Sequence, residues 1–387
     1  MTTAPLYPEL YRYQPSALQH AAAAAANPGT SSHRNLAIPL KRLRQHAESA
    51  ADFKAVSVTD KPNLPPSGDP KDYQSIATYV WPDPDKEDGL PWIEIDGKRN
   101  PECDNYDQEP LSRLSNAVST LSLSAFLLQN RDHGRHAARL LHHWYLDPVT
   151  GMNPNLNFGQ HHPGVCHGRP WGIIESALHI PPMLESASLL EWTGDLPASN
   201  ADALRDFFSR FLDWLQSHPH ALAITCFHNN HGVYFDQLAA RIALFIGQPA
   251  VAKAVLARVP HKIREQIAAD GSQPHEMKRA NALIYSAMNL RGFLQLSVMA
   301  APLGIDLDSP ATPEGRTLRG GIRFLCELVT GKRKAEFREH AEWRPHVAAL
   351  LAMAGYRFDD ADLLETAATI DPGLSAHRVH LTHAAIP

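Results

Sequence analysis

Apolar residues recur at helical spacing through most of the chain after residue 111, and this pattern constrains the fold more than any other feature. The clearest stripe contains Leu204, Phe207, Phe211 and Leu215, which fall on one face of a helix because they lie three or four residues apart. Similar stripes predict helices at 131–145, 171–192, 232–246, 250–269, 281–300, 316–330, 344–356 and 360–370. Most of the chain is therefore expected to be helical.

Two further helices are predicted near the N-terminus, one ending in the alanines at 21–26 and one at about 35–52. No segment alternates apolar and polar residues for long enough to predict a sheet. Helices joined by short turns pack as antiparallel hairpins, which stack into a solenoid or close into a ring. We expect an all-α chain, a single domain over residues 1–387, with about five to seven helical pairs.

The segment at about 53–110 is the exception to the helical pattern. Prolines recur in it from Pro62 to Pro110, interleaved with glycine and aspartate. So long an irregular segment in a compact chain is usually functional or disordered. Its aromatic residues favour an ordered loop that packs against the helices. They include Tyr73, Tyr79, Trp81 and Trp92.

Charge and composition exclude several classes of protein. The net charge of -5 argues against a general nucleic-acid binder, although a local cluster of Arg and His can still attract an anion. No stretch reaches the roughly 18 consecutive apolar residues of a membrane span. No signal peptide is visible, which leaves both a cytoplasmic protein and a trimmed secreted chain open. The cysteines are widely spaced and form no CxxC, so they predict neither a disulfide framework nor a zinc finger.

Asn229, Asn230 and His231 lie at the predicted start of an amphipathic helix. Backbone N–H groups and the helix dipole favour an anion at such a position, so these side chains are candidates for an anion site. The simpler interpretation is a helix cap, because Asn is among the best N-cap residues and histidine often packs as an ordinary side chain. Taken alone, this run is more often a cap than a site.

Arg279 and Tyr285 form a second candidate pair, in a turn and on the first turns of the following helix. This placement lets both side chains approach one cleft. A cation beside a tyrosine lowers the pKa of its hydroxyl, so Arg279 would make Tyr285 a usable base. The simpler interpretation is a surface arginine and a half-buried tyrosine, which is the commoner outcome for such a pair.

A third polar segment covers residues 152–171. Amide and guanidinium groups bind hydroxyls and carboxylates, and an aromatic face covers the apolar side of a sugar ring, so the mixture is typical of a carbohydrate site. Its members include Asn155, Gln160, His167, Arg169 and Trp171.

The same segment has a competing interpretation as a zinc site. His161, His162, Cys166 and His167 are plausible ligand types. Their spacing matches no standard zinc finger, and the neighbouring His161 and His162 would not normally bind one ion together. We therefore expect no metal and no cofactor.

These groups together suit the β-elimination of a 1,4-linked polyuronate. The enzyme must neutralise the uronate carboxylate, because charge spreads into it as the C5 proton leaves. Asn230, His231 and Arg279 are suitable for that task, and Tyr285 and His231 are credible proton-transfer groups. No nucleophile is required, which agrees with the absence of a Gly-x-Ser-x-Gly motif.

Several runs, in chain order, resemble the alginate lyase domain family. They cover roughly residues 65–300 and lie at 73–84, 88–92, 152–157, 168–174, 229–236 and 279–286. Within this group the pattern is most similar to polysaccharide lyase family 38, and more distantly to the family 5 alginate lyases. The resemblance implies an (α/α) toroid, complete or incomplete, with the substrate cleft across the ring.

The resemblance also implies catalytic roles for four residues. Asn230 and His231 match the pair that meets the substrate carboxylate and the C5 proton. Tyr285 matches the tyrosine that protonates the leaving oxygen, and Arg279 matches the arginine beside it. In β-linked mannuronate and glucuronate the C5 proton and the leaving oxygen share one face of the ring, so one residue or a close His–Tyr pair can act as base and acid.

The chain departs from the family pattern at Ile284, where a histidine is expected, and at Asn281, where a second arginine is common. These departures bear on substrate choice more than on the reaction. The expected partner is an anionic uronate polysaccharide or oligosaccharide, either mannuronate-rich alginate or β-1,4-glucuronan. Substrate-binding roles are predicted for Trp81, Asn155, Gln160, His167, Arg169, Trp171, Asn229 and Tyr234.

Other function classes predict different observations. A non-catalytic carbohydrate-binding protein would bind polyuronate without forming product. A glycoside hydrolase on the same toroid needs two opposed carboxylates, and the candidates Asp236 and Glu276 are better interpreted as supports that orient the His and Arg groups. A helical scaffold for protein partners would not need the polar density at 152–171 and 228–236.

Overall fold

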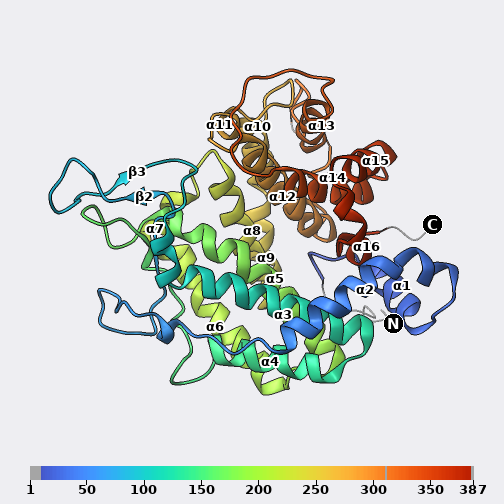
Figure 1. Cartoon of the computed structure of the whole chain (residues 1–387), viewed down its shortest axis with the longest axis horizontal. Helices are drawn as coiled ribbons and strands as arrows, with labels where there is room; N and C mark the ends of the chain where they lie inside the picture. Colours follow the sequence, from blue (N-terminus) through green and yellow to red (C-terminus); the bar gives the residue numbers. More distant parts are fainter. Residues whose placement is uncertain (1–9, 310–311, 385–387) are drawn as a thin grey trace.

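The apolar stripe at 204–215 is the buried face of helix α6 (Ala198–Ser217). The rings of Phe207, Phe208 and Phe211 pack on one another inside the main core. The computed structural model describes residues 10–309 and 312–384. Within these residues the helices form an (α/α) toroid, as expected (Figure 1).

The inner helices of the ring each pack against the next in chain order. They are α3 (Gln108–Leu128), α5 (Ile173–Thr193), α8 (Asn230–Phe245), α12 (Ala282–Ala300) and α14 (Arg344–Phe358). Nearly every residue of α8 is buried, because neighbours surround it on all sides.

Outer helices cover this wall and bury one face each. They are α2 (Ser31–Ala51), α4 (Arg131–Tyr145), α6, α9 (Pro249–Leu256), α13 (Leu318–Val329) and α15 (Ala361–Ile370). The remaining helices are α1 (Pro15–Ala26), α7 (Pro219–Ile224), α10 (Val259–Gln266), α11 (Pro274–Met277) and α16 (Val379–Thr382).

The first and last helices close the ring. Helix α16 contacts α1, α2 and α14, and these elements lie side by side on the right of Figure 1. The backbone N–H of Gln14 donates to the carbonyl oxygen of Thr382 at 2.8 Å. Segments from the two ends of the sequence therefore complete the toroid together.

The single helix predicted at 250–269 is wrong, because the structure divides it into α9 and α10. Pro260 lies in the first turn of α10. Proline lacks a backbone N–H and restricts the residue before it, so a helix more readily restarts than continues there.

Two small sheets lie outside the helices, and the sequence pattern did not predict them. Strand β1 (Gln74–Ile76) pairs in parallel with β4 (Phe158–His161), and β2 (Val80–Trp81) pairs antiparallel with β3 (Ile93–Glu94). The first sheet joins the irregular segment to the 152–171 loop, and the second lies within the irregular segment. Among the described residues, no helix combines the length and apolar character that a membrane crossing requires.

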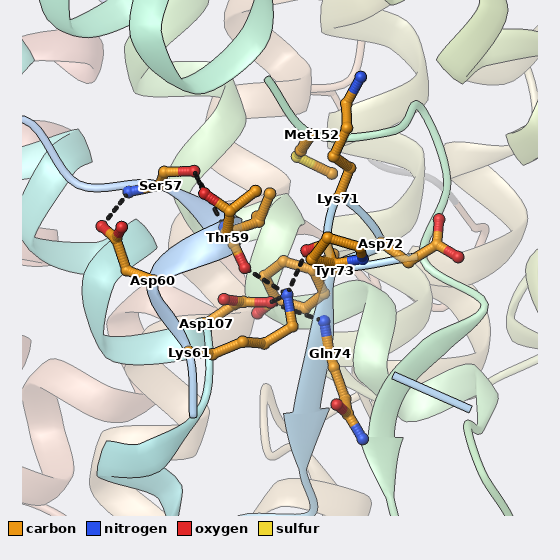
Figure 2. A network of polar contacts seen from close by, with 12 residues as sticks. Ser57, Thr59, Asp60, Lys61, Lys71, Asp72, Tyr73, Gln74, Asp107 and Met152 are labelled. Carbon is orange, nitrogen blue, oxygen red and sulfur yellow. Dashed lines mark hydrogen bonds and ion pairs between the residues drawn. The ribbon is translucent and has the colours of Figure 1, made fainter. Parts of the chain in front are cut away.

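The irregular segment is ordered and anchored by a buried ion pair (Figure 2). Lys61 Nζ lies 3.1 Å from Asp107 Oδ2, and both side chains are almost fully buried. Asp107 Oδ2 also accepts from the backbone N–H of Gln74 at 2.8 Å, at the start of β1. Because Asp107 directly precedes α3, this network fixes the segment to the inner wall. The predicted packed loop is therefore present.

Candidate active site

A cavity of about 480 Å³ lies where the irregular segment meets α5 and the N-terminal ends of α8 and α12. Its lining contains all four residues predicted to be catalytic: Asn230, His231, Arg279 and Tyr285. It also contains four of the predicted substrate-binding residues: Gln160, Arg169, Trp171 and Asn229. Three polar segments far apart in the sequence thus meet at one cavity.

Asn229 caps α8, since its Oδ1 accepts from the backbone N–H of His231 at 3.2 Å. Asn229 is therefore both the cap of the helix and part of the cavity lining. Gly232 permits the tight turn, because a Cβ there would lie 2.3 Å from the carbonyl oxygen of Phe227. Lys262 Nζ donates to the carbonyl oxygen of Gly232 at 2.7 Å and braces the first turn.

Asn230 is held by the buried carboxylate of Glu276. The backbone N–H of Asn230 donates to Glu276 Oε1 at 2.7 Å, and Nδ2 lies 3.0 Å from each carboxylate oxygen. Asn230 Oδ1 is buried and finds no hydrogen-bond partner in the described part of the chain. Burial raises the pKa of Glu276 to about 7, although the bonds from Asn230 oppose the shift.

His231 is a neutral imidazole at the cavity wall. Burial, and then the charges of Arg279 and Arg169, lower the pKa of His231 to about 3. Its Nδ1 is buried and has no hydrogen-bond partner among the described residues. At neutral pH the ring can therefore accept a proton from a bound molecule.

Tyr285 lies on the first turn of α12, under Arg279. The guanidinium carbon of Arg279 is 3.9 Å from the centre of the Tyr285 ring, and the Tyr285 and Tyr79 hydroxyl oxygens are 2.5 Å apart. Burial raises the pKa of Tyr285 well above its usual value, the Tyr79 hydroxyl raises it further, and Arg279 only partly opposes this. The charge of Arg279 lowers the pKa of Tyr285 as predicted, but desolvation outweighs this effect, so the pKa lies above its usual value.

Asp96 orients Arg279. Arg279 Nη2 donates to Asp96 Oδ1 at 2.7 Å and Nε donates to Oδ2 at 3.2 Å. Asp96 Oδ2 also accepts from the backbone N–H of Ala280 at 3.0 Å. The hydrogen bond from Arg279 lowers the pKa of Asp96. This two-point contact fixes the plane of the guanidinium above Tyr285.

Gln160 and Arg169 form another part of the cavity wall. Arg169 donates to Gln160 Oε1 from Nε at 3.1 Å and from Nη2 at 3.0 Å. Gln160 has a φ of 52°, a left-handed conformation that is uncommon for a residue with a side chain and is often found at functional sites. A Cβ on Gly172 would lie 2.4 Å from the carbonyl carbon of Gly159, so these glycines allow the close approach that places Gln160.

Glu175 is a buried carboxyl that also lines the cavity, and it was not among the residues predicted from the sequence. Tyr73 donates to Glu175 Oε2 at 2.7 Å. Burial raises the pKa of Glu175 to about 7, and hydrogen bonds from Ser75, Tyr73 and Gln160 oppose the shift. Tyr79 and Asp96 were missed as site residues too, because they lie in the irregular segment and no local pattern relates them to α12.

Four predicted substrate-binding residues do not line the cavity. Asn155 Nδ2 donates to Asp72, and Trp81 Nε1 donates to the carbonyl oxygen of Lys98. Tyr234 is 4% exposed and donates to the carbonyl oxygen of Met288. The ring of His167 stacks on that of His161, with 5.6 Å between centroids. These contacts hold the surroundings of the cavity in place.

The described residues contain no group of three or more His, Cys, Asp or Glu side chains arranged to hold a metal ion. His162 Nε2 lies 2.7 Å from the carbonyl oxygen of Trp92, so this ring nitrogen has a hydrogen-bond partner within the protein. Residues 161–167 belong to the same loop as Arg169.

Known proteins are similar to this chain. The chain is similar to an alginate lyase from Bacteroides ovatus, with 30% identity, 98% of this chain and 100% of that chain covered, and a TM-score of 0.91. It also shares the fold of alginate lyase A1-III from Sphingomonas species A1, at 17% identity with both chains fully covered and a TM-score of 0.60. No curated protein matches. The alginate lyase family model matches residues 57–335. The chain belongs to the alginate lyase family and is a polysaccharide lyase.

Proposed function

We propose that this enzyme cleaves mannuronate-rich alginate or β-1,4-glucuronan by β-elimination and leaves a 4,5-unsaturated uronate end. The observation that carries the proposal is the meeting of a neutral His231 and a protonated Tyr285 at one cavity with Arg169 and Arg279. An A1-III variant has been solved with a tetrasaccharide, which supports an anionic oligosaccharide as the substrate class.

The protonation states favour a division of labour between the two proton-transfer groups. A base must start without a proton and an acid must start with one, and neutral His231 and the Tyr285 hydroxyl meet these requirements. His231 takes the C5 proton, and Tyr285 gives its proton to the leaving O4. The substrate carboxylate beside His231 raises the pKa of the imidazole, which strengthens it as a base in the complex.

Arg279 and Asn230 neutralise the carboxylate in this proposal. Asn230 Nδ2 now faces Glu276, so the side-chain amide must turn over before Nδ2 can donate to the substrate. A protonated Glu276 then donates to Asn230 Oδ1 and holds the turned amide. The pKa of Glu276, about 7, makes that proton available near neutral pH.

The two carboxylates considered for a hydrolase do not support that alternative. Asp236 is fully buried between Arg258 Nη2 at 2.6 Å and Lys262 Nζ at 2.7 Å, and neither Asp236 nor Glu276 lines the cavity. Both carboxylates instead hold the groups around the first turn of α8.

Ultraviolet absorbance of the unsaturated uronate tests the proposal. Polymannuronate, polyguluronate and glucuronan are offered separately to the wild type and to Tyr285→Phe. We expect absorbance to rise with polymannuronate or glucuronan in the wild type only. Binding without a rise on any polymer would identify a carbohydrate-binding protein instead, and saturated products would identify a hydrolase.

A further inference from the structure

A second cavity, of about 380 Å³, adjoins the candidate active site. The two cavities share Leu178 and His179 on α5. The second cavity extends from there to the place where the ends of the ring meet, at α16 and the segment before α1. Its volume lies within the range of about 300–1,000 Å³ that is usual for ligand sites.

The lining of this second cavity is strongly cationic. Arg12, Arg291 and Arg378 line it, and no aspartate or glutamate of the described chain does. Among the described residues, the ion pairs include none of these three arginines. Arg291 donates from Nε to the Tyr234 hydroxyl at 3.4 Å, and this neutral group does not balance the charge of the guanidinium.

The backbone of Arg12 is held at this cavity by the carboxylate of Glu185. Glu185 is fully buried and accepts from the backbone N–H groups of Tyr11, Arg12 and Tyr13 at 3.2, 2.8 and 3.0 Å. The negative charge of Glu185 is paired with Arg241 at 3.1 Å. Glu185 thus fixes the backbone of Arg12, and the described ion pair of Glu185 is with Arg241 and not with the Arg12 guanidinium.

The histidines of this cavity add no positive charge at neutral pH. Burial, and then Arg12, lower the pKa of His179 to about 4 and that of His383 to about 3. The arginines alone therefore set the field, and no described acidic side chain in the cavity neutralises it. An uncompensated charge deep in a protein is costly, so it is favoured where a ligand of opposite charge completes the pair.

We infer that the second cavity is a distal subsite, in which Arg12 and Arg291 bind the carboxylate of another sugar of the same polyuronate chain. The inference rests on the proposed function, because a polyuronate carries one carboxylate on every sugar. The chain runs from the cleaved residue beside His231 and Tyr285, past His179, to the arginines. A neutral polysaccharide would gain nothing from this cavity.

Oligouronates of increasing length test the subsite. Arg12→Gln and Arg291→Gln are compared with wild type and with Arg44→Gln, a matched control on the exposed face of α2. We expect each cavity variant to raise KM roughly tenfold on long oligomers and to leave the shortest cleaved oligomer unchanged. The control behaves as wild type. Equal loss at every length, or no loss at any length, would overturn the subsite.

Calorimetric binding of the same oligomers separates this inference from the proposed reaction. We expect wild type to bind long oligomers more tightly than dimers, and Arg12→Gln to lose that advantage with an unchanged melting temperature. Absence of product from the wild type would overturn the reaction alone. Equal affinity of the wild type for short and long oligomers would overturn the subsite.

Discussion

The hydroxyl oxygens of Tyr79 and Tyr285 lie 2.5 Å apart, although 206 residues separate them in the sequence. This contact ties the irregular segment to the first turn of α12, and both tyrosines line the cavity. The irregular segment therefore takes part in the site, and its Tyr79 adds to the rise in the pKa of Tyr285 that burial causes.

Replacing Tyr285 by Phe removes the proposed acid and keeps the ring under Arg279. We expect kcat to fall by about 10²–10⁴, which is the usual contribution of a general acid or base. Binding measured by calorimetry should stay close to that of wild type, because the arginines are untouched. Normal turnover of Tyr285→Phe on the preferred polymer would contradict the role.

Replacing Tyr79 by Phe acts on Tyr285 through its pKa. The Tyr79 hydroxyl raises the pKa of Tyr285, so the variant should lower it. In a Glu276→Gln background, which lacks the decline near pH 7, the alkaline limb of the rate profile should therefore move to lower pH. The profile of kcat against pH checks this. An unshifted limb would show that Tyr79 serves only to pack the loop.

Replacing Glu276 by Gln tests the proposal that the side-chain amide of Asn230 turns over and is then held by a hydrogen bond from residue 276. Burial raises the pKa of Glu276 to about 7, so its proton is present below that pH and is lost as pH rises through it. Wild-type activity should therefore decline above about pH 7. A glutamine donates to Asn230 Oδ1 at any pH, so Glu276→Gln should stay active and lose this decline. Inactivity of the variant at every pH, with an intact fold by circular dichroism, would contradict the idea.

Glu276 also links stability to pH. Because its folded pKa lies above that of the unfolded chain, its contribution to stability is full at acid pH and declines as pH rises from the unfolded pKa through about 7. Melting temperatures measured across this window should fall less in Glu276→Gln than in wild type. A parallel fall in both proteins would place the titrating group elsewhere.

Replacing Asp96 by Asn releases Arg279 from its two-point contact. We expect KM to rise and the folding free energy to change by at most about 1 kcal/mol, because the ion pair is partly exposed. Kinetics on the preferred oligomer and thermal melting measure the two effects. A large loss of stability with unchanged KM would show a structural role instead.

Much of the fold could be predicted because helical periodicity is local. Leu204 and Phe211 belong to the same buried face whatever the rest of the chain does, and Asn229 caps α8 through its own neighbours. The error at 250–269 also has a local cause, since the apolar pattern continued across Pro260 while the backbone could not.

The sequence by itself determined the helices, their buried faces, the cap at Asn229 and the order of the motifs that indicate the family. Only the tertiary structure decided that Glu276 holds Asn230 and that the hydroxyl of Tyr79 contacts that of Tyr285. It also decided that Arg12 and His179 line the same cavity. Periodicity and capping depend on neighbours a few residues away, which the sequence displays directly. The protonation of Tyr285 and His231 depends on burial and on charges brought from distant segments, which exist only after the ring has closed.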